Sequence, residues 1–569
     1  MNQHDYIALR IINTCLRENV SGVLTQGDIR QEHGSHWLYN SHLNHPMRIE
    51  VAASDYMQSW IAIAPRWQIQ QGDNWLSQEG YQNWLALLMP DKQEETLQLY
   101  ANYKEEADAA CEQGELCQSA FVQLSESLAR QPGNMSWGER LLHADQIASY
   151  LDHPYYPTAR AKFGFDIAQL RRYAPEFCQP FALRWLAVPK EALTLTRPSN
   201  RPAWWPSYEQ VGLDDTLSQS HELIPVHPLT WSQLSTLPEG AIAAPLAWLD
   251  VRPTLSVRTV QLESDPATHL KIPLAMRTLG QKNIRLIKPS TLYDGQWFAE
   301  ILPALAQNDP LLQGRYRHVD ESFCGHLGEE KLFAFLVRRY PAPQEQETLA
   351  PVAALGGSLP DGQSYLEYML AQPGMPDIVS WWQEYCQLMA DVHLTLWLRY
   401  GIALESNQQN AILSFTPGKP LSLMMKDNDA ARLWAPRFNA ARPDLAHHLD
   451  ALRDERICVE DEQALAQMFI TITLQLDLAA VLENLAARGA LPRQQGYQIL
   501  RDALLRTIEQ LEHAGCDTAL ARQVLFAEDY QPVKYLLLSG SLLSKQASGA
   551  ADINKYYGQS GPNFLKGSA

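Results

Sequence analysis

The chain has 569 residues, of which 46% are hydrophobic, and a formal net charge of -18. This length fits two to four domains of about 100–200 residues each, and the apolar content argues against wholesale disorder. An acidic chain lacks the basic face that nucleic-acid binding needs. The start has no signal-peptide pattern and no apolar run is long enough to span a bilayer, so we expect neither a nucleic-acid nor a membrane partner. The eight cysteines include no CxxC pair, which favours reduced thiols in the cytoplasm over a disulfide framework or a zinc site.

The first part of the chain, residues 1–145, is predicted to be mostly helical. Tyr6–Leu16 carries apolar residues at helical spacing, and the charged stretch Glu94–Leu128 is typical of one or two surface helices. Trp37–Tyr39 and Ile49–Ala52 are candidates for short strands. This region holds no catalytic pattern, so we expect a supporting or dimer-forming domain.

A loop rich in proline and aromatic residues follows at Leu151–Phe165. Its prolines exclude a regular helix at the start. His153, Arg160 and Lys162 lie on it, and a histidine with two cations is able to bind phosphate. An ordinary surface loop with solvated cations fits this segment equally well.

A short strand is expected within His221–Trp231, ending at His227-Pro228. A single histidine at a strand end is more often structural than functional, so His227 is a weak candidate.

Three segments then predict successive strands of an antiparallel sheet, namely Pro253–Val260, Lys271–Ala275 and Asn283–Ile287. Alternation along a strand would turn Ser256 and Arg258 to one face. A hydroxyl and several cations on one face are typical of an anion site, because arginine forms forked bonds to phosphate or carboxylate. The alternative is weak ion pairing across a wet sheet face. The remaining basic side chains of this cluster are Lys271, Arg277 and Arg285.

The most informative stretch runs from Gly401 to Asp427. Gly401 is suited to ending the predicted helix Ser380–Tyr400, since glycine adopts the left-handed conformation without a Cβ clash. Ala411–Phe415 and Leu421–Lys426 predict a hairpin around a Pro-Gly-Lys-Pro turn. Acidic and amide side chains precede the hairpin, and one aspartate follows it: Glu405, Asn407, Gln409, Asn410 and Asp427.

An asparagine and an aspartate that flank a hairpin are able to share one Mg²⁺, which prefers oxygen ligands and phosphates. Protein kinases use an Asn and an Asp in this way. An ordinary polar loop beside a hairpin is the alternative. Further amphipathic helices are predicted at Glu462–Leu482 and Gln495–Glu512. Lys534 lies in the apolar run Val533–Leu538 and needs an anionic partner or a path to water.

With these residues in view, the chain resembles the IucA/IucC family of siderophore synthetases that work without a peptide assembly line. Ser256-Val257-Arg258-Thr259 is similar to the SxRT motif of the family, and Lys271 matches the lysine that opens its next strand. Glu405 to Asn410 resembles the segment EAHGQN, followed by the matching Asp427. His153-Pro154 resembles the GHP loop, and His227-Pro228 resembles the HPWQ loop.

The resemblance implies an α+β, cupped-hand fold. It comprises a helical thumb (1–145), antiparallel β-rich fingers (146–370) and a mostly helical palm (371–569). ATP would lie between fingers and palm. The residues implied for ATP are His153, Ser256, Arg258, Thr259, Lys271, Glu405, Asn410 and Asp427; Asn410 and Asp427 would also hold Mg²⁺, and Arg258, Lys271, Asn410 and Asp427 would be catalytic. The candidates for binding the carboxylate substrate are Arg277, Arg285, Asn407, Gln409 and Lys534.

The implied chemistry has two steps. A carboxylate, typically citrate or a derivative of it, attacks the α-phosphate of ATP, and an amine or alcohol then displaces AMP to give an amide or ester. Three features depart from the family pattern. Asn407 and Tyr156 replace histidines, Arg160 and Lys162 are exchanged, and the interval from Lys271 to Arg285 is two residues longer than the family pattern leads us to expect.

Two rival functions stay open at this point. One is a small-molecule kinase, suggested by the hairpin, although no Asp occupies the position of a kinase base. The other is a binding protein that lost its activity. We expect a cytoplasmic homodimer that acts on small molecules.

Overall fold

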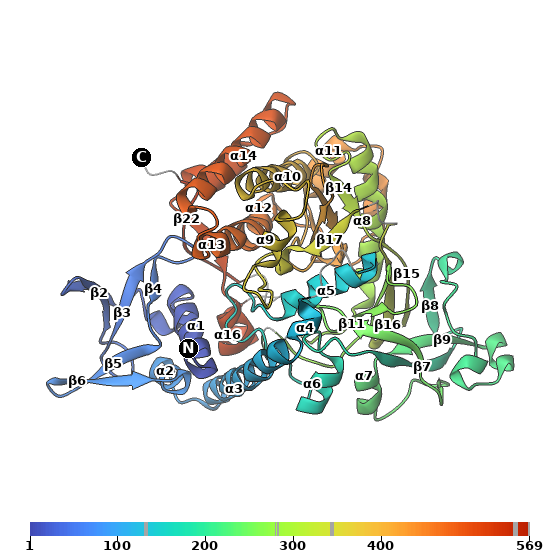
Figure 1. Ribbon diagram of the computed structural model, residues 1–569, viewed down its shortest axis with the longest axis horizontal. Helices are drawn as coiled ribbons and strands as arrows, with labels where there is room; N and C mark the ends of the chain where they lie inside the picture. Colours follow the sequence, from blue (N-terminus) through green and yellow to red (C-terminus); the bar gives the residue numbers. More distant parts are fainter. Residues whose placement is uncertain (130–134, 279, 281–283, 342–345, 550–555, 567–569) are drawn as a thin grey trace.

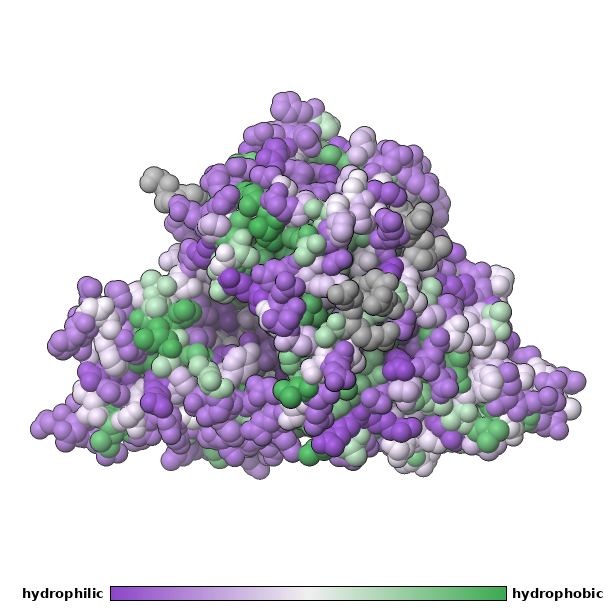
Figure 2. Space-filling model, in the orientation of Figure 1, coloured by the Kyte–Doolittle hydropathy of each residue, from purple (hydrophilic) through white to green (hydrophobic). Residues whose placement is uncertain are grey.

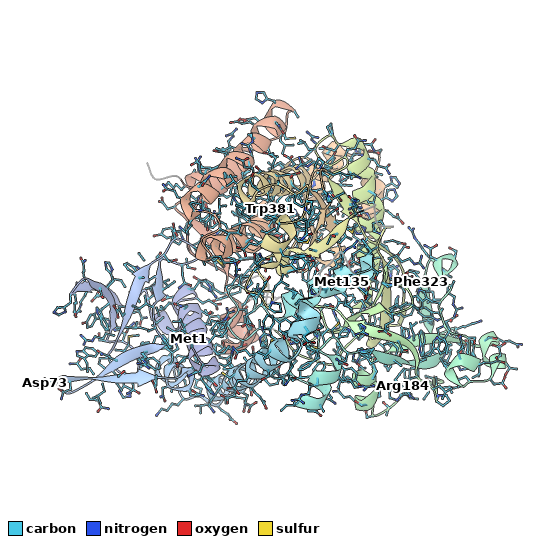
Figure 3. All side chains as sticks on the ribbon, viewed as in Figure 1. Met1, Asp73, Met135, Arg184, Phe323 and Trp381 are labelled. Atoms are coloured by element: carbon cyan, nitrogen blue, oxygen red, sulfur yellow. The ribbon has the colours of Figure 1, made fainter. Side chains whose placement is uncertain are left out.

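The computed structural model describes residues 1–129, 135–278, 280, 284–341, 346–549 and 556–566. Figure 1 shows three lobes: one formed by the N-terminal residues, one by the middle of the chain, and one that includes most of the C-terminal helices. Large buried aromatic side chains mark their interiors, such as Phe323 and Trp381 in Figure 3. The eight cysteines all lie in the described residues and are free thiols.

The N-terminal lobe combines helices with a six-stranded sheet of order β1-β2-β3-β5-β6, in which β4 pairs with β3. Apolar side chains of the first helix, including Ile11 and Ile12, pack with Leu38 and Ile49 of the sheet in one core. Two of the strands, β2 and β3, match the predicted ones. The strands β1, β4, β5 and β6 were not predicted. The elements are α1 (Gln3–Arg17), β1 (Asp28–Glu32), β2 (Ser35–Asn40), β3 (Met47–Ala53), β4 (Trp60–Ala62), β5 (Arg66–Gln71), β6 (Asn74–Glu79), α2 (Tyr81–Leu88), α3 (Glu94–Gln123) and α4 (Ser125–Leu128).

The middle lobe is a nine-stranded sheet of order β10-β7-β11-β12-β13-β16-β15-β8, with β9 on β7. Neighbouring strands pair antiparallel throughout the described part of this sheet, as predicted. Its elements and neighbours are α5 (Trp137–Ser149), α6 (Ile167–Tyr173), β7 (Phe181–Pro189), β8 (Leu193–Thr196), β9 (His221–Val226), α7 (Pro228–Gln233), β10 (Ile242–Ala243), β11 (Trp248–Pro253), β12 (Thr259–Leu262), β13 (Thr268–Lys271), β15 (Asp320–Leu327) and β16 (Glu330–Arg339).

Three strand predictions in this sheet are wrong in detail. The segment Ser256–Arg258 is a turn between β11 and β12, because Val257 has the positive φ of 65°. Lys271 ends strand β13 instead of opening one, and residues 272–276 are not in a strand. Ile284–Ile287 makes only an isolated bridge to Arg277, and Asn283 lies outside the described residues.

The third lobe is built on a four-stranded sheet of order β14-β20-β19-β17. The predicted hairpin forms its centre, with Ala411 paired to Met425. The outer strands β14 and β17 come from residues assigned to the fingers, so this sheet crosses the predicted boundary at 370. The elements are α8 (Pro289–Asn308), β14 (Tyr316–His318), β17 (Thr348–Pro351), α9 (Tyr365–Leu370), α10 (Ile378–Leu398), β18 (Ile402–Ala403), β19 (Ala411–Phe415), β20 (Ser422–Met425), β21 (Arg432–Leu433) and α11 (Ala435–Ala441).

Helices from the end of the chain complete this lobe, and α14 packs along α10. The continuous helix Gln463–Ala487 is long and apolar enough to cross a membrane, contrary to our expectation, but 89% of its most apolar part is buried inside the protein. It is therefore a core helix here. The elements are α12 (Gln463–Met468), a π-helical segment (Phe469–Ala479), α13 (Ala480–Ala487), α14 (Arg493–His513), α15 (Ala519–Arg522), β22 (Tyr530–Lys534), α16 (Lys545–Ser548) and β23 (Tyr557–Pro562).

The buried carboxylate of Glu18 connects the two ends of the chain. It follows α1 and accepts hydrogen bonds from the backbone amides of Leu537 (3.0 Å) and Leu538 (2.8 Å). Burial raises the pKa of Glu18 to about 7, although Arg17 and these amides oppose the shift. Glu18 therefore binds a proton more tightly in the folded protein than in the unfolded chain.

We predict that Glu18 makes folding less favourable as the pH rises. Its folded pKa lies above the unfolded value, so its stabilising contribution is complete below about pH 4.5 and is lost by about pH 7. The loss should be on the order of 3 kcal/mol. The measurement is the free energy of unfolding from pH 4 to 8 for the wild type and Glu18→Gln, with the exposed Glu112→Gln as control. A wild-type minus Glu18→Gln difference that stays flat with pH would contradict the assignment.

Gly401 and Gly418 form a natural pair of test positions. Both have a positive φ, 66° and 69°. A Cβ added at Gly401 would lie 2.8 Å from the carbonyl oxygen of Trp434, whereas one at Gly418 would meet nothing within 4 Å. Gly418→Ala should cost about 1–2 kcal/mol from backbone strain alone. Gly401→Ala should cost about 1–3 kcal/mol more, because a backbone atom must move. Urea unfolding of both variants measures the difference, and equal losses would refute the steric argument.

Candidate active site

A buried lysine connects the nine-stranded and four-stranded sheets. Lys271 ends β13 and is 3% exposed. Its Nζ forms an ion pair with Asp427, which lies two residues after the end of β20, and is 3.2 Å from Oδ2 of Asp429. Because β13 and β20 belong to different sheets, these contacts fix one sheet against the other.

An arginine and a glutamate extend this charge cluster. Arg338 on β16 lies 3.2 Å from Oδ1 of Asp427 and donates from Nε to Glu321 at 2.6 Å. Glu321 also accepts the backbone N–H of Asp427 at 3.1 Å. Burial would raise the pKa of Asp427, but Lys271, Arg338 and Arg258 outweigh it and hold the pKa below its usual range. Burial and the charge of Asp427 raise the pKa of Asp429, despite Lys271.

The SxRT-like turn lies directly beside Lys271, since Thr259 pairs with Lys271 across β12 and β13. The Ser256 hydroxyl accepts the N–H of Thr259 at 3.1 Å and so closes the turn. Arg258 donates to the carbonyl of Leu286 at 2.6 Å. Burial lowers the pKa of Arg258, and the charges of Asp427 and Asp429 oppose that shift. The turn therefore presents its arginine to the same charge cluster.

The two competing arginines have different surroundings. Arg285 donates from Nε to Thr278 at 2.8 Å. Burial and the nearby Arg258 lower its pKa to about 10, against the opposing charges of Glu405 and Asp427. Arg277 instead lies over the ring of Phe163, 4.9 Å from its centroid. Arg285 is therefore electrostatically coupled to the cluster, while the guanidinium of Arg277 lies over Phe163 and acts on the charge of Glu106.

The loop before the hairpin is organised by Asn407. Its side-chain oxygen accepts the backbone N–H groups of Gln409 (3.0 Å) and Asn410 (3.1 Å). Asn410 donates from its side chain to the carbonyl of Glu405 at 3.2 Å. The N–H of Lys426 donates to the carbonyl of Asn410 at 3.3 Å, so Asn410 and Asp427 lie at the same end of the hairpin.

Glu405 and Lys534 approach one another from separate elements. Lys534 on β22 is 3% exposed, and Glu405 is half-buried. Burial raises the pKa of Glu405, and the charges of Lys534 and Arg432 oppose this shift. Lys534 thus has the anionic neighbour that its apolar sequence context required.

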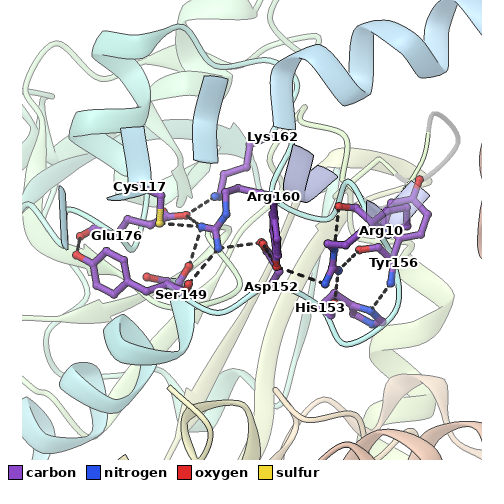
Figure 4. Close-up of polar contacts among 12 residues, drawn as sticks. Arg10, Cys117, Ser149, Asp152, His153, Tyr156, Arg160, Lys162 and Glu176 are labelled. Atoms are coloured by element: carbon purple, nitrogen blue, oxygen red, sulfur yellow. Dashed lines mark hydrogen bonds and ion pairs between the residues drawn. The ribbon is translucent and has the colours of Figure 1, made fainter. Parts of the chain in front are cut away.

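His153 caps a turn in the predicted loop Leu151–Phe165. Its Nδ1 accepts the N–H groups of Tyr155 (3.3 Å) and Tyr156 (3.1 Å), while Arg10 donates to its carbonyl at 2.5 Å (Figure 4). Burial, with Arg10 and Arg17, lowers the pKa of His153 to about 3. The imidazole is therefore neutral and, with Nδ1 accepting, carries its proton on Nε2.

His227 plays a purely local part. Its Nδ1 accepts the N–H of Leu229 at 3.0 Å, where it caps α7. Its ring is fully buried against Tyr173 and Phe181, with centroids 5.1 Å apart in each case. The structural interpretation of this histidine therefore holds.

Arg160 and Lys162 do not form the phosphate-binding pair that the loop suggested. Arg160 lies 2.8 Å from Asp152 and 3.4 Å from Glu176, and Lys162 lies 2.6 Å from the same glutamate (Figure 4). Arg160 and Lys162 both pair with Glu176. Exchanging arginine and lysine between these two positions therefore leaves two positive charges beside this carboxylate. Tyr156 donates to Glu106 at 2.8 Å, within the N-terminal lobe.

Sequence reasoning missed Asp429, Arg338 and Glu321. The alternation of Asp427 with Asp429 after a strand was a usable signal, since two carboxylates two residues apart often share a cation. Arg338 interrupts an apolar strand and therefore needed a buried partner. Glu321 carried no signal that distinguishes it from other strand glutamates.

The donor chemistry of the cluster fits a nucleotide with Mg²⁺. Two carboxylates and the Asn410 amide supply oxygen atoms, and a cation, Lys271 Nζ, already lies between the carboxylates. Among the described residues, no group of three or more His, Cys, Asp or Glu side chains could hold a metal. A magnesium ion at this position would therefore depend on phosphate oxygens as well.

A separate cavity of about 570 Å³ lies between α1, the β3–β4 loop and α13–α14, and Figure 2 shows a recess in this region. None of its lining residues belongs to the charge cluster. Its arginines are already engaged: Arg10 and Arg17 donate to carbonyls of the 153–157 loop, and Arg493 pairs with Asp55 and Glu483.

Comparison with known proteins agrees with the resemblance seen in the sequence. The sequence model of the IucA / IucC family matches residues 140–357, and that of the ferric iron reductase FhuF-like transporter matches residues 379–548. Staphyloferrin B synthase of Staphylococcus aureus is 24% identical over 76% of this chain and 76% of its own length. L-2,3-diaminopropanoate–citrate ligase of the same organism is 25% identical over 49% of this chain and 52% of its own.

Solved structures share the whole fold. The petrobactin biosynthesis protein AsbB of Bacillus anthracis covers 98% of this chain, with a TM-score of 0.76, 17% identity and 95% of its own length matched. ATP-bound aerobactin synthetase IucA of Klebsiella pneumoniae covers 99% of this chain, with a TM-score of 0.73, 17% identity and its full length matched. The chain therefore has the cupped-hand α+β fold of these synthetases, matches the IucA / IucC family over residues 140–357, and is an enzyme of the ligase class.

Proposed function

We propose that this enzyme adenylates a carboxylic acid, citrate or a citrate derivative, with ATP and condenses the product with an amine or alcohol. The buried cluster of Lys271, Arg338, Asp427 and Asp429 beside the SxRT-like turn carries this proposal. The cations Arg258, Lys271 and Arg338 suit a polyphosphate, and the carboxylates of Asp427 and Asp429 suit its metal. Among the structures that share this fold, one is an ATP-bound aerobactin synthetase.

In the first step, the carboxylate attacks the α-phosphate and pyrophosphate leaves. Ser256, Arg258, Thr259 and Lys271 would contact the phosphates, together with the Nε2–H of His153, and Glu405 would lie near the nucleotide. Asn410 and Asp427, with Asp429, would hold Mg²⁺, which supplies positive charge to the developing phosphate charges. Preorganised cations lower the barrier because they need no rearrangement during the reaction.

In the second step, an amine or alcohol attacks the acyl carbon and AMP leaves. A free carboxylate is a poor acyl donor, whereas AMP is a good leaving group. Arg285 is our first candidate for holding the acid, because it is coupled to Glu405 and Asp427. Asn407, Gln409 and Lys534 would complete this side of the site, and Arg277 becomes the weaker alternative. The names of relatives that ligate citrate with diaminopropanoate or spermidine support an amine partner.

The small-molecule kinase alternative gains no support from the relatives named above. Position 407 offers no base, because the Asn407 carboxamide oxygen already accepts two backbone N–H groups. A binding protein without activity would not turn over ATP at all. We retain a cytoplasmic homodimer as an expectation, which sedimentation velocity would test.

We predict that the purified protein releases pyrophosphate and AMP from ATP and Mg²⁺ when it is given the right acid. The assay uses citrate, 2-oxoglutarate, succinate and a citryl monoamide, with hydroxylamine to trap the acyl-adenylate. Release with one of them supports the proposal and identifies the acid. ADP in place of AMP would support the kinase, and no turnover with any acid would support the inactive binding protein.

We predict that Arg258→Ala and Asp427→Asn each lower the rate of pyrophosphate release by at least about 100-fold, since each removes a charge that acts on the phosphates or metal. Asp427→Asn keeps the shape of the side chain, so the fold should survive. Arg252→Ala is the matched control, because Arg252 lies in the neighbouring strand β11 and pairs with Glu263 at 2.7 Å on the surface. Normal release from either site variant would refute the assignment.

Asn407→His should fold like the wild type and change the choice of acid. The oxygen of Asn407 accepts the N–H groups two and three residues ahead, as Nδ1 of His153 does in its own turn. A histidine is therefore able to keep this turn while its Nε2 reaches further into the cleft. The measurement is kcat/KM for each acid in the panel together with the melting temperature. A variant with an unchanged acid profile would show that residue 407 does not contact the substrate.

A further inference from the structure

The π-helical segment Phe469–Ala479 is hydrogen-bonded to the loop before the hairpin and to two other parts of the chain. The carbonyls of three consecutive residues accept side-chain donors. Gln475 accepts from Tyr56 at 3.0 Å, Leu476 from Gln408 at 2.7 Å, and Asp477 from Tyr385 at 2.9 Å. A π-helix is rare, and single π-turns are frequent at functional sites.

The side chain of Asp477 is directed to the loop before the hairpin. It is fully buried, and Ser406, between Glu405 and Asn407, donates to its Oδ2 at 2.9 Å. Its Oδ1 has no hydrogen-bond partner, and no ion pair to Asp477 occurs among the described residues. An isolated buried carboxylate is costly, so the group is held as a neutral acid. Burial accordingly raises the pKa of Asp477 well above its usual range.

The same segment also holds the strand that carries Lys534. Gln475 donates from its side chain to the carbonyl of Pro532 in β22 at 2.9 Å, two residues before Lys534. The π-helical segment therefore contacts the 405–410 loop and β22, which bear three of the proposed acid-binding residues, Asn407, Gln409 and Lys534. Of the phosphate-binding candidates, Arg258 and Lys271 lie instead on the nine-stranded sheet and its turn.

We propose that Asp477 is a positioning residue: through its hydrogen bond to Ser406, the π-helical segment sets the loop that binds the carboxylic acid. This inference rests on the proposed function and deepens it. Asp477 does not touch substrate. It acts through Ser406 on residues 405–410, while Gln475 fixes β22 from the same segment.

The test compares four variants in the pyrophosphate assay. Asp477→Leu and Ser406→Ala should each raise KM for the acid about tenfold or more. KM for ATP should rise by a smaller factor, because Glu405 and Asn410 lie on the same loop while Arg258 and Lys271 keep their places. The double variant should be no worse than either single variant, because both remove one hydrogen bond. Asp477→Asn should stay within about threefold of the wild type, since a carboxamide replaces a neutral acid in shape and hydrogen bonding.

Asp391→Asn is the matched control. Asp391 is another buried aspartate of the third lobe, on α10, and it binds Arg315 (2.7 Å) and Thr507 (2.7 Å). Its loss should lower the melting temperature and leave KM for the acid unchanged. If Asp391→Asn and Asp477→Leu shift KM equally, Asp477 is an ordinary core residue and the proposal fails. A loss of activity in Asp477→Asn would equally overturn it, because it would require a charged group.

Hydrogen exchange separates this proposal from the proposed function, because it needs no turnover. In Asp477→Leu, amides of the 405–410 peptide should exchange at least about fivefold faster, and those of β12 and β13 should not change. Absence of pyrophosphate release by the wild type would refute the proposed function alone. Unchanged exchange in the 405–410 peptide would refute the positioning role whatever the activity.

Discussion

The burial of Lys271 between two carboxylates is the constraint on which this structure depends. A buried ammonium group is tolerated only with close anionic partners, and here they come from a different sheet. Such pairs add little net stability, since desolvation offsets most of their attraction. Their effect is geometric. They fix the end of β13 against the end of β20, and the backbone N–H of Asp427 is held by Glu321 at the same time.

Capping side chains recur around this junction. His153, His227 and Asn407 each place an acceptor atom against backbone N–H groups two or three residues ahead. A histidine Nδ1 and an asparagine Oδ1 occupy equivalent positions relative to the backbone, so the exchange at 407 preserves the turn. The two residues differ in their other polar atom. Imidazole offers Nε2 on the far edge of its ring, whereas asparagine offers the Nδ2 amide group next to the capping oxygen.

Periodicity and turn chemistry predicted the local elements well. The β19–β20 hairpin, the helix α10 with its left-handed Gly401, the strand β9 and the helix α14 lie where the sequence indicated. The SxRT-like segment was misread as a strand, because a valine with positive φ has no signature in a single sequence. The six-stranded sheet was mostly missed, since its strands are short and its apolar residues fit more than one pattern.

The site was predicted in its residue types and only partly in its connections. Family motifs marked Lys271, Arg258 and Asp427, but the partners Arg338 and Asp429 required knowledge of which strands meet. Asp477 is a stronger case, because its partner Ser406 lies 71 residues away. A buried acid in an apolar helix signals that some polar group must reach it, and the sequence does not say which one.

The contact of Glu18 with Leu537 and Leu538 joins residues 519 and 520 positions apart. During synthesis, α1 leaves the ribosome long before the segment that receives its final carboxylate. Until Leu537 and Leu538 are synthesised, Glu18 lacks the backbone N–H groups that it binds in the folded protein. The N-terminal lobe completes this contact only when the last tenth of the chain is available. Lys534, our candidate for binding the acid, belongs to the same late segment. Long-range contacts of this kind slow folding, and they make the nascent chain a natural client for chaperones.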